Sequence, residues 1–431
     1  MELSARRVGQ WIMFLLGVFS TLQIVTIFGV TIFNLIALVA FLYFFLIEWG
    51  WYKSPFNGKI LIFLLLCGIT TVWALLNNAT PRDYKSVALT SCVNYFILFG
   101  IFIETKNGPR SYIDKFTSGF KISCNIQIIW CILQILLFYI FSVDLNHVIF
   151  NRLLGITDLT SRYVDDVLVC TGLSWHPANL IPILAFCFFY YKNIVLKLVC
   201  VVLAILSHSA TAQIVISLCC LYAIIREGKQ LLFARSSVKQ WALAALLISI
   251  LLIYVATDNN LIVQTINDVL DRIRDIYSVE AGNSSATHFS YYLRLGGIYE
   301  QTDIVTILFG YGIGCSGVPY SMYFNQYTDQ IWVVESDFIN LLLSQGLFGF
   351  IAFYVLFISI IVKCAKRSKQ AAVFLLILLI CGVTYNLQYN WVILVELMMY
   401  TMSKRGTSSL HDVRIKEKKS YFYNKCQAMP I

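Results

Sequence analysis

Three side chains with acid–base chemistry stand where polar segments of the chain lead into apolar ones. His176 lies in a short polar turn, and Glu335 and Asp337 directly precede a long apolar run. A carboxylate or an imidazole can position a hydroxyl group or accept its proton. A lone histidine more often only completes a turn, so His176 also has a purely structural interpretation.

Basic side chains in two long polar segments, 142–177 and 257–337, form a second set of candidates. Arginine stays protonated, and its fork of N–H donors matches the oxygens of a phosphate group. The alternative for each arginine is an ion pair that only stabilises the fold. His208, in the polar break 207–211, is a further candidate because polar groups at membrane depth usually have a function. The arginines are Arg152, Arg162, Arg272, Arg274 and Arg294.

The composition indicates which elements must position these side chains. Of the 431 residues, 59% are apolar and 13% are charged, whereas soluble domains have about 45–50% and about 25%. The chain also contains 31 Phe, 25 Tyr and 9 Trp, which is too aromatic for a disordered protein. A polytopic membrane protein is the class that fits.

The apolar runs predict an all-α membrane domain of about twelve spans over residues 1–431, because a span needs about 20 apolar residues. The run 11–47 is long enough for two helices with a turn near 28–34, and the run 195–225 is split by a hairpin at 207–211. The other runs are 60–76, 87–103, 122–141, 179–191, 241–256, 338–362, 371–385 and 388–402.

The positions of the lysines and arginines predict the orientation of these spans. With both termini cytoplasmic, 25 of the 32 basic residues lie on the inner side, as the positive-inside rule requires. The net charge of +9 then reflects topology and the basic cytoplasmic tail, 403–431, and we expect no nucleic-acid partner. Segments 142–177 and 257–337 become periplasmic loops. Connections of this length usually have a function, so the outer face is the expected active face.

The second of these segments contains three further patterns. Residues 261–277 have an apolar stripe typical of a helix that lies on the membrane surface or packs on the bundle. Gly310, Gly312 and Gly314 resemble a dinucleotide fingerprint, but no βαβ unit surrounds them, so a tight turn is the better interpretation. Several aromatic residues follow and could stack on sugars or sit at the lipid interface. They are Tyr320, Tyr323, Phe324, Tyr327 and Trp332.

The 13 cysteines are scattered, with no spacing typical of a zinc or haem site. We therefore expect no metal and no cofactor. Cys170 and Cys315 are the two cysteines placed outside, in a compartment that permits disulfides, and we predict that they pair.

Residues 337–349, Asp-Phe-Ile-Asn-Leu-Leu-Leu-Ser-Gln-Gly-Leu-Phe-Gly, together with Arg294 and the Gly310–Gly314 turn, resemble the O-antigen polymerase (Wzy) and O-antigen ligase superfamily. The layout, with a large periplasmic loop between late spans, agrees over nearly the whole chain, and the motifs agree over 207–211 and 294–350. The family often has an arginine after its Ser-x-Ser turn, where this chain offers His208. Ligases commonly have a histidine where this chain has Glu335 and Asp337, which favours a polymerase.

The resemblance implies an inverting, metal-independent glycosyltransferase of the bacterial inner membrane. It would move a growing glycan from undecaprenyl diphosphate to a new lipid-linked repeat unit at the periplasmic face. The leaving diphosphate must be neutralised as the glycosidic bond breaks. The implied catalytic residues are Arg294, Glu335, Asp337 and His176, and the implied diphosphate-binding residues are Arg272, Arg274, Arg152, Arg162 and His208.

The implied partners are the undecaprenyl-diphosphate-linked donor and acceptor and the membrane lipids, with a chain-length regulator as a further candidate. Two alternatives stay open: an O-antigen ligase that transfers polymer to lipid A-core, and a flippase that carries lipid-linked sugars. The sequence shows no convincing internal repeat and few charges within the spans, both of which disfavour the flippase.

Overall fold

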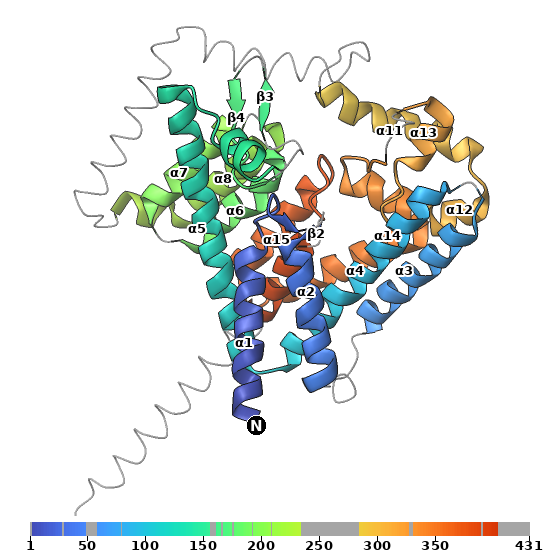
Figure 1. Cartoon of the computed structure of the whole chain (residues 1–431), viewed down its shortest axis with the longest axis horizontal. Helices are drawn as coiled ribbons and strands as arrows, with labels where there is room; N and C mark the ends of the chain where they lie inside the picture. Colours follow the sequence, from blue (N-terminus) through green and yellow to red (C-terminus); the bar gives the residue numbers. More distant parts are fainter. Residues whose placement is uncertain are drawn as a thin grey trace, which may run out of the picture.

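The structure is a computed structural model of the chain, and it describes residues 2–27, 30–48, 58–78, 80–155, 161–164, 167–174, 176–191, 193–207, 209–233, 284–326, 331–388 and 391–403. This part of the chain is mostly helical (Figure 1). Its strands form two short antiparallel hairpins, β1 (Thr26–Ile27) with β2 (Val30–Thr31), and β3 (Arg162–Val164) with β4 (Val167–Val169).

Four helices are long and apolar enough to cross a membrane, which confirms the predicted helical class with membrane-spanning candidates. They are α3 (Gly58–Leu76), α4 (Arg82–Asn107), α5 (Arg110–Phe141) and α14 (Asp337–Ala365). Helix α5 begins well before the predicted start at Ile122. At about 1.5 Å per residue it is longer than the roughly 30 Å hydrocarbon core of a bilayer.

Shorter helices complete the bundle, and both predicted breaks are present. The chain reverses between α1 and α2 through the β1–β2 hairpin, and α7 ends at Leu206 before α8 begins at Ala210. The predicted runs 241–256 and 261–277 and the tail from residue 404 lie outside the described residues. The further elements are α1 (Glu2–Phe19), α2 (Ile32–Tyr43), η1 (Phe44–Glu48), η3 (His147–Leu153), η4 (Pro177–Leu180), α6 (Ile181–Tyr190), α7 (Ile194–Leu206), α8 (Ala210–Phe233), α11 (Ser284–Gln301), α12 (Ile304–Phe309), α13 (Val318–Phe324), α15 (Lys369–Cys381) and the last helix (Trp391–Ser403).

Helix α1 packs closely along α5 through two glycines. A Cβ on Gly17 would lie 2.2 Å from the Phe116 carbonyl oxygen, and one on Gly119 would lie 2.1 Å from the Phe14 carbonyl oxygen. Small residues at such crossings allow two helix backbones to approach closely. This pair forms one side of the bundle, and α3, α4 and α14 lie on the other side (Figure 1).

Described parts of the two long polar segments lie at the same end of the molecule. In Figure 1 the β3–β4 hairpin of segment 142–177 and helices α11 and α13 of segment 257–337 lie at the top, and the N-terminus lies at the bottom.

Helix α14 is broken at Gly346, where φ is 64° and ψ is −174°. The break lets a neighbouring turn pair with the end of the first half of the helix. The N–H of Tyr311 donates to the Leu343 carbonyl (2.8 Å), and the N–H of Gly312 donates to the Ser344 carbonyl (2.9 Å). The carbonyl groups that the break releases are thus hydrogen-bonded within the protein.

The glycine turn that provides these donors is the tight turn predicted from the sequence. Gly310, Gly312 and Gly314 have φ angles of 80°, 117° and 77°, which L-residues with a side chain rarely adopt.

Candidate functional site

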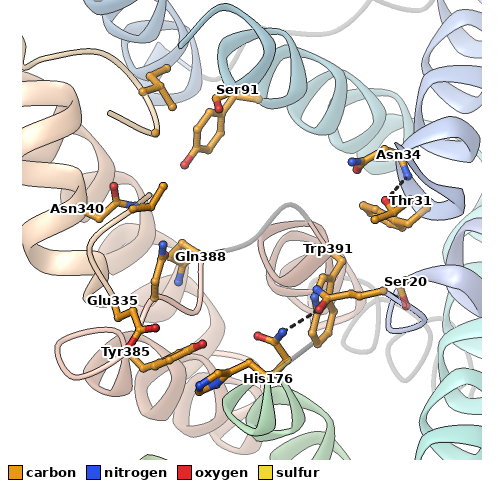
Figure 2. Close-up of a pocket in the computed structure, with 18 residues that line it drawn as sticks. Ser20, Thr31, Asn34, Ser91, His176, Glu335, Asn340, Tyr385, Gln388 and Trp391 are labelled. Carbon is orange, nitrogen blue, oxygen red and sulfur yellow. Dashed lines mark hydrogen bonds between the residues drawn. The ribbon is translucent and has the colours of Figure 1, made fainter. Parts of the chain in front are cut away.

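A cavity of about 510 Å³ opens between the helices (Figure 2). Its size falls in the range of about 300–1,000 Å³ that is typical of small-molecule sites. Glu335 is the only Asp, Glu, Lys or Arg among the described residues that line it. The cavity is lined by Ser20, Gln23, Thr31, Phe33, Asn34, Ser91, Tyr95, His176, Asn179, Ile313, Gly314, Val333, Glu335, Asn340, Tyr385, Asn386, Gln388 and Trp391.

Two of the residues predicted from the sequence, His176 and Glu335, line this cavity, with Tyr385 between them (Figure 2). His176 comes from the end of segment 142–177 and Glu335 from the end of segment 257–337. The structure therefore brings the ends of the two long polar segments to one cavity.

His176 is held in one orientation by a hydrogen bond and a stacked ring. It caps η4, where its Nδ1 accepts the N–H of Ala178 at 3.2 Å. Its imidazole stacks on the ring of Tyr385, with centroids 4.8 Å apart and an angle of 17° between the planes. Because Nδ1 is an acceptor, the proton of the neutral ring is on Nε2. This histidine is therefore placed as a hydrogen-bond donor.

The backbone on both sides of Glu335 is anchored by hydrogen bonds. The N–H of Val334 donates to Ser316 Oγ at 3.0 Å. Ser336 caps α14, and its hydroxyl bonds the Val383 carbonyl (2.8 Å) and the Tyr292 hydroxyl (2.9 Å). Burial raises the pKa of Tyr292, so this phenol stays protonated as a donor. These anchors hold the half-buried Glu335 at the cavity wall, as a positioned base requires.

Asp337 is used differently from Glu335, although the two are close in sequence. Its carboxylate accepts the backbone N–H of Leu387 (2.9 Å) and of Gln388 (3.0 and 3.2 Å), and its own N–H donates to the Gly382 carbonyl (2.7 Å). Asp337 is buried and does not line the cavity. These bonds fix the 382–388 segment, and the geometry gives Asp337 a positioning role.

Four buried residues on the cavity wall have a polar atom without a hydrogen bond in the described part of the protein. These atoms are Asn179 Oδ1, Asn386 Oδ1, Gln388 Oε1 and Trp391 Nε1. Unpaired buried polar groups cost about 1–3 kcal/mol each, so native proteins rarely gather them without a partner for them. Sequence reasoning missed this cluster. The signal available was the polar run Tyr385-Asn386-Leu387-Gln388 between two apolar stretches.

The buried side chain of Glu396 lies behind this wall. Glu396, in the last helix, accepts a long hydrogen bond of 3.5 Å from Gln388 Nε2. The bond directs the amide nitrogen of Gln388 to the carboxylate and leaves Oε1 of the same amide unpaired.

Arg294 lies on α11, outside the cavity lining. Its guanidinium carbon is 5.0 Å from the centroid of the Phe324 ring, in a cation–π contact. Its Nη1 is buried without a hydrogen bond, and among the described carboxylates none forms an ion pair with it. The ion-pair interpretation therefore has no support within the described residues. Tyr292, on the same helix, links α11 to Ser336, next to Glu335.

Of the predicted diphosphate-binding residues, Arg152 is described with its side chain and does not line the cavity. Arg152 is exposed on η3, and Arg162 begins β3. Arg272, Arg274 and His208 lie outside the described residues.

The predicted disulfide between Cys170 and Cys315 is wrong in this structure, because both thiols are free and buried. The Sγ of Cys315 lies 3.3 Å from the Tyr84 carbonyl oxygen, in a small cluster at the start of α4. Cys170 packs in the main core, with Cys131 as a neighbour. The two cysteines therefore belong to different parts of the interior.

The aromatic residues near position 320 mostly pack on one another. Tyr320 is fully buried, and its hydroxyl donates to the Tyr291 carbonyl at 2.6 Å. The ring of Trp332 lies 5.9 Å from the rings of both tyrosines. Besides the imidazole of His176, the aromatic rings on the cavity wall are Phe33, Tyr95, Tyr385 and Trp391. None of these four was singled out from the sequence.

No protein-family model matches the chain, and no curated protein matches it significantly. Within the residues that the structure describes, no group of three or more His, Cys, Asp or Glu side chains is placed to hold a metal ion.

Proposed function

We propose that this chain is a membrane glycosyltransferase that polymerises lipid-linked oligosaccharides at the outer face of a bacterial inner membrane. The observation that supports this most is the cavity that Glu335 and His176 line beside four buried residues with unpaired polar atoms. A sugar carries many hydroxyl groups, each of which both donates and accepts hydrogen bonds. It can therefore satisfy such a wall, which an apolar ligand cannot.

The chemical step assigns one role to each polar group at the cavity. The hydroxyl oxygen of the acceptor sugar attacks the anomeric carbon of the donor, and a new glycosidic bond forms. The bond from that carbon to the diphosphate oxygen breaks, and the diphosphate leaves with the electron pair. Glu335 takes the hydroxyl proton, and His176 Nε2 donates a hydrogen bond that orients the substrate.

Arg294 is the candidate for the departing diphosphate. Its guanidinium has hydrogen-bonding capacity that the described residues do not use, and α11 is tied to the residue next to Glu335. The cation–π contact with Phe324 holds the guanidinium over that ring. A positioned arginine can bind phosphate oxygens through two parallel N–H bonds.

The membrane arrangement is part of the same proposal. About twelve spans with both termini in the cytoplasm would put segments 142–177 and 257–337 in the periplasm, where lipid-linked repeat units are joined. The β3–β4 hairpin and helices α11 and α13, which belong to these segments, lie at one end of the molecule, and this supports the arrangement (Figure 1).

A ligase would use the same chemistry with lipid A-core as the acceptor, and the structure offers no observation that favours it. A flippase would use broken helices whose free backbone groups line a path. Helix α14 is broken at Gly346, but the Leu343 and Ser344 carbonyls at the break are bonded to the glycine turn. The break therefore gives the flippase little support.

Reconstitution tests the proposal directly. The purified full-length protein is placed in liposomes with lipid-linked repeat units extracted from cells that lack its gene. We expect polymer to form with no other protein present, which would exclude a flippase. Cells without the gene should display core plus one repeat unit, whereas bare core would indicate a ligase. Failure to form polymer, together with bare core in these cells, would overturn the proposal.

A further inference from the structure

We infer that the cavity holds the uncharged, hydroxyl-bearing end sugar of the acceptor and excludes both the lipid diphosphate and acidic sugars. This inference rests on the proposed function and specifies which part of the substrates the cavity binds. Charge, hydrogen-bonding capacity and the position of Arg294 each support it independently.

The charge of the cavity is unsuited to an anion. Among its described lining residues there is no lysine or arginine, and its one charged group is the carboxylate of Glu335. Two further acidic side chains lie behind the wall, because Asp337 accepts the backbone N–H of Gln388 and Glu396 accepts its side-chain amide. Within the described lining, a phosphate or uronate would meet the acidic side chain of Glu335 and no lysine or arginine.

The unused hydrogen-bonding groups point to the same class of ligand. The amide nitrogen of Asn179 donates to Gln23 Oε1 (2.8 Å), and the amide nitrogen of Gln388 donates to Glu396. The side-chain carbonyl oxygen of each residue has no hydrogen bond. Phosphate and carboxylate oxygens only accept, and they cannot satisfy an amide oxygen. A hydroxyl group can donate to these oxygens and also accept from Trp391 Nε1.

The guanidinium group of Arg294, whose Nη1 has no hydrogen bond among the described residues, lies outside the cavity lining. Arg294 packs on Phe324 outside the cavity lining. Tyr292, two residues before it, bonds Ser336 beside Glu335. Residues two apart on a helix do not face each other, so Arg294 is directed to a different side of α11 from Tyr292. The Arg294 guanidinium thus lies outside the cavity that Glu335 lines.

Binding of small probes to the full-length protein in phosphatidylcholine nanodiscs tests the inference by saturation-transfer NMR. The neutral probes are the methyl glycosides of glucose, galactose and N-acetylglucosamine. The acidic probe is methyl glucuronide, which differs from the glucoside by one carboxylate. Inorganic pyrophosphate serves as the competitor.

We expect at least one neutral glycoside to bind, the glucuronide to bind at least tenfold more weakly than the glucoside, and excess pyrophosphate not to displace the neutral probe. Gln388→Ala should weaken neutral binding about tenfold, and Trp391→Phe, which keeps the ring and loses only the N–H, should weaken it several-fold. Gln326→Ala is the matched control, since Gln326 also has an unpaired side-chain oxygen but lies outside the cavity, and it should bind normally.

The inference is overturned if no neutral glycoside binds, if pyrophosphate displaces it, if the glucuronide binds as well as the glucoside, or if both cavity variants bind normally. Its failure is distinguishable from failure of the proposed function. Polymer formation in liposomes without selective neutral binding leaves the function standing and removes the inference. Absence of polymer under the same conditions removes the function itself.

Discussion

His176 and Tyr385 stack face to face, with ring centroids 4.8 Å apart. The contact joins the end of segment 142–177 to the loop that precedes the last helix, and both residues line the cavity. Because Nδ1 of the histidine also accepts the Ala178 N–H, the imidazole is held by its face and by one nitrogen. The cavity wall is thus assembled by contacts between segments that are far apart in the chain.

Glu335→Gln should lower the rate of polymer formation about 100-fold or more, because the amide cannot accept the hydroxyl proton and general-base catalysis contributes roughly 10²–10⁴-fold. The initial rate in liposomes measures this. The thermal stability should be unchanged, since the variant keeps the shape of the side chain. Glu300→Gln, at an exposed carboxylate of α11, is the control and should retain full activity. Normal activity of Glu335→Gln would remove Glu335 from the mechanism.

Arg294→Lys should retain part of the activity and Arg294→Ala should lose nearly all of it. Lysine keeps the charge but loses the planar fork of N–H donors, which lies over Phe324 in the natural protein. The measurement is the dependence of the rate on the concentration of lipid-linked donor, in which we expect a raised KM for the lysine variant. Arg82→Ala, at an exposed arginine at the start of α4, is the matched control. An equal loss of activity in Arg294→Ala and Arg82→Ala would indicate a general effect of the lost charge.

Asp337→Ala should lower the free energy of unfolding by about 2–4 kcal/mol, because the buried N–H groups of Leu387 and Gln388 lose their acceptor. Thermal unfolding in detergent measures the effect. Asp337→Asn keeps one carbonyl oxygen and should lie between the alanine variant and the natural protein. Native stability with lost activity would show instead that Asp337 acts in the chemistry.

Gly346→Ala should be destabilised by at least about 1–3 kcal/mol, because alanine strains a backbone with φ of 64°. The new Cβ would also lie 2.4 Å from the Leu308 carbonyl group. Thermal unfolding again provides the measurement. Gly296→Ala, on α11 with open space around its Cα, is the control, and its stability should be equal or slightly higher. A normal melting temperature for Gly346→Ala would contradict the observed break in α14.

Cys170 and Cys315 should both react with an alkylating reagent after unfolding without reductant. Mass spectrometry of the labelled peptides detects this directly. The expectation follows from their burial in separate clusters as free thiols. A peptide pair linked through these two cysteines would contradict the structure at both sites.

Much of the fold could be predicted because it depends on local composition. Apolar runs of suitable length produced most of the helices, and the polar break at Ser207 to Thr211 and the glycines at 310, 312 and 314 indicated turns that the structure contains. The disulfide prediction failed because compartment and residue type do not specify distance. Cys170 and Cys315 are both in polar segments, but packing places them in different clusters.

The candidate site could be predicted only in part. Glu335 and His176 were recognisable because ionisable groups are rare at the ends of apolar runs. The roles of Glu335 and Asp337 could not be separated in the sequence, since a carboxylate that faces a cavity and one that binds backbone N–H groups have the same local signature.

The sequence by itself determined that the chain is helical and apolar, where most of its helices begin and end, and that its ionisable groups gather in a few polar segments. Those features follow from the burial preference of each residue and from backbone hydrogen bonding, which are properties of short stretches. Only the tertiary structure decided that Asn179, Asn386, Gln388 and Trp391 share one wall with Glu335. That convergence depends on how the helices pack against one another, and packing is set by side-chain shapes across the whole bundle.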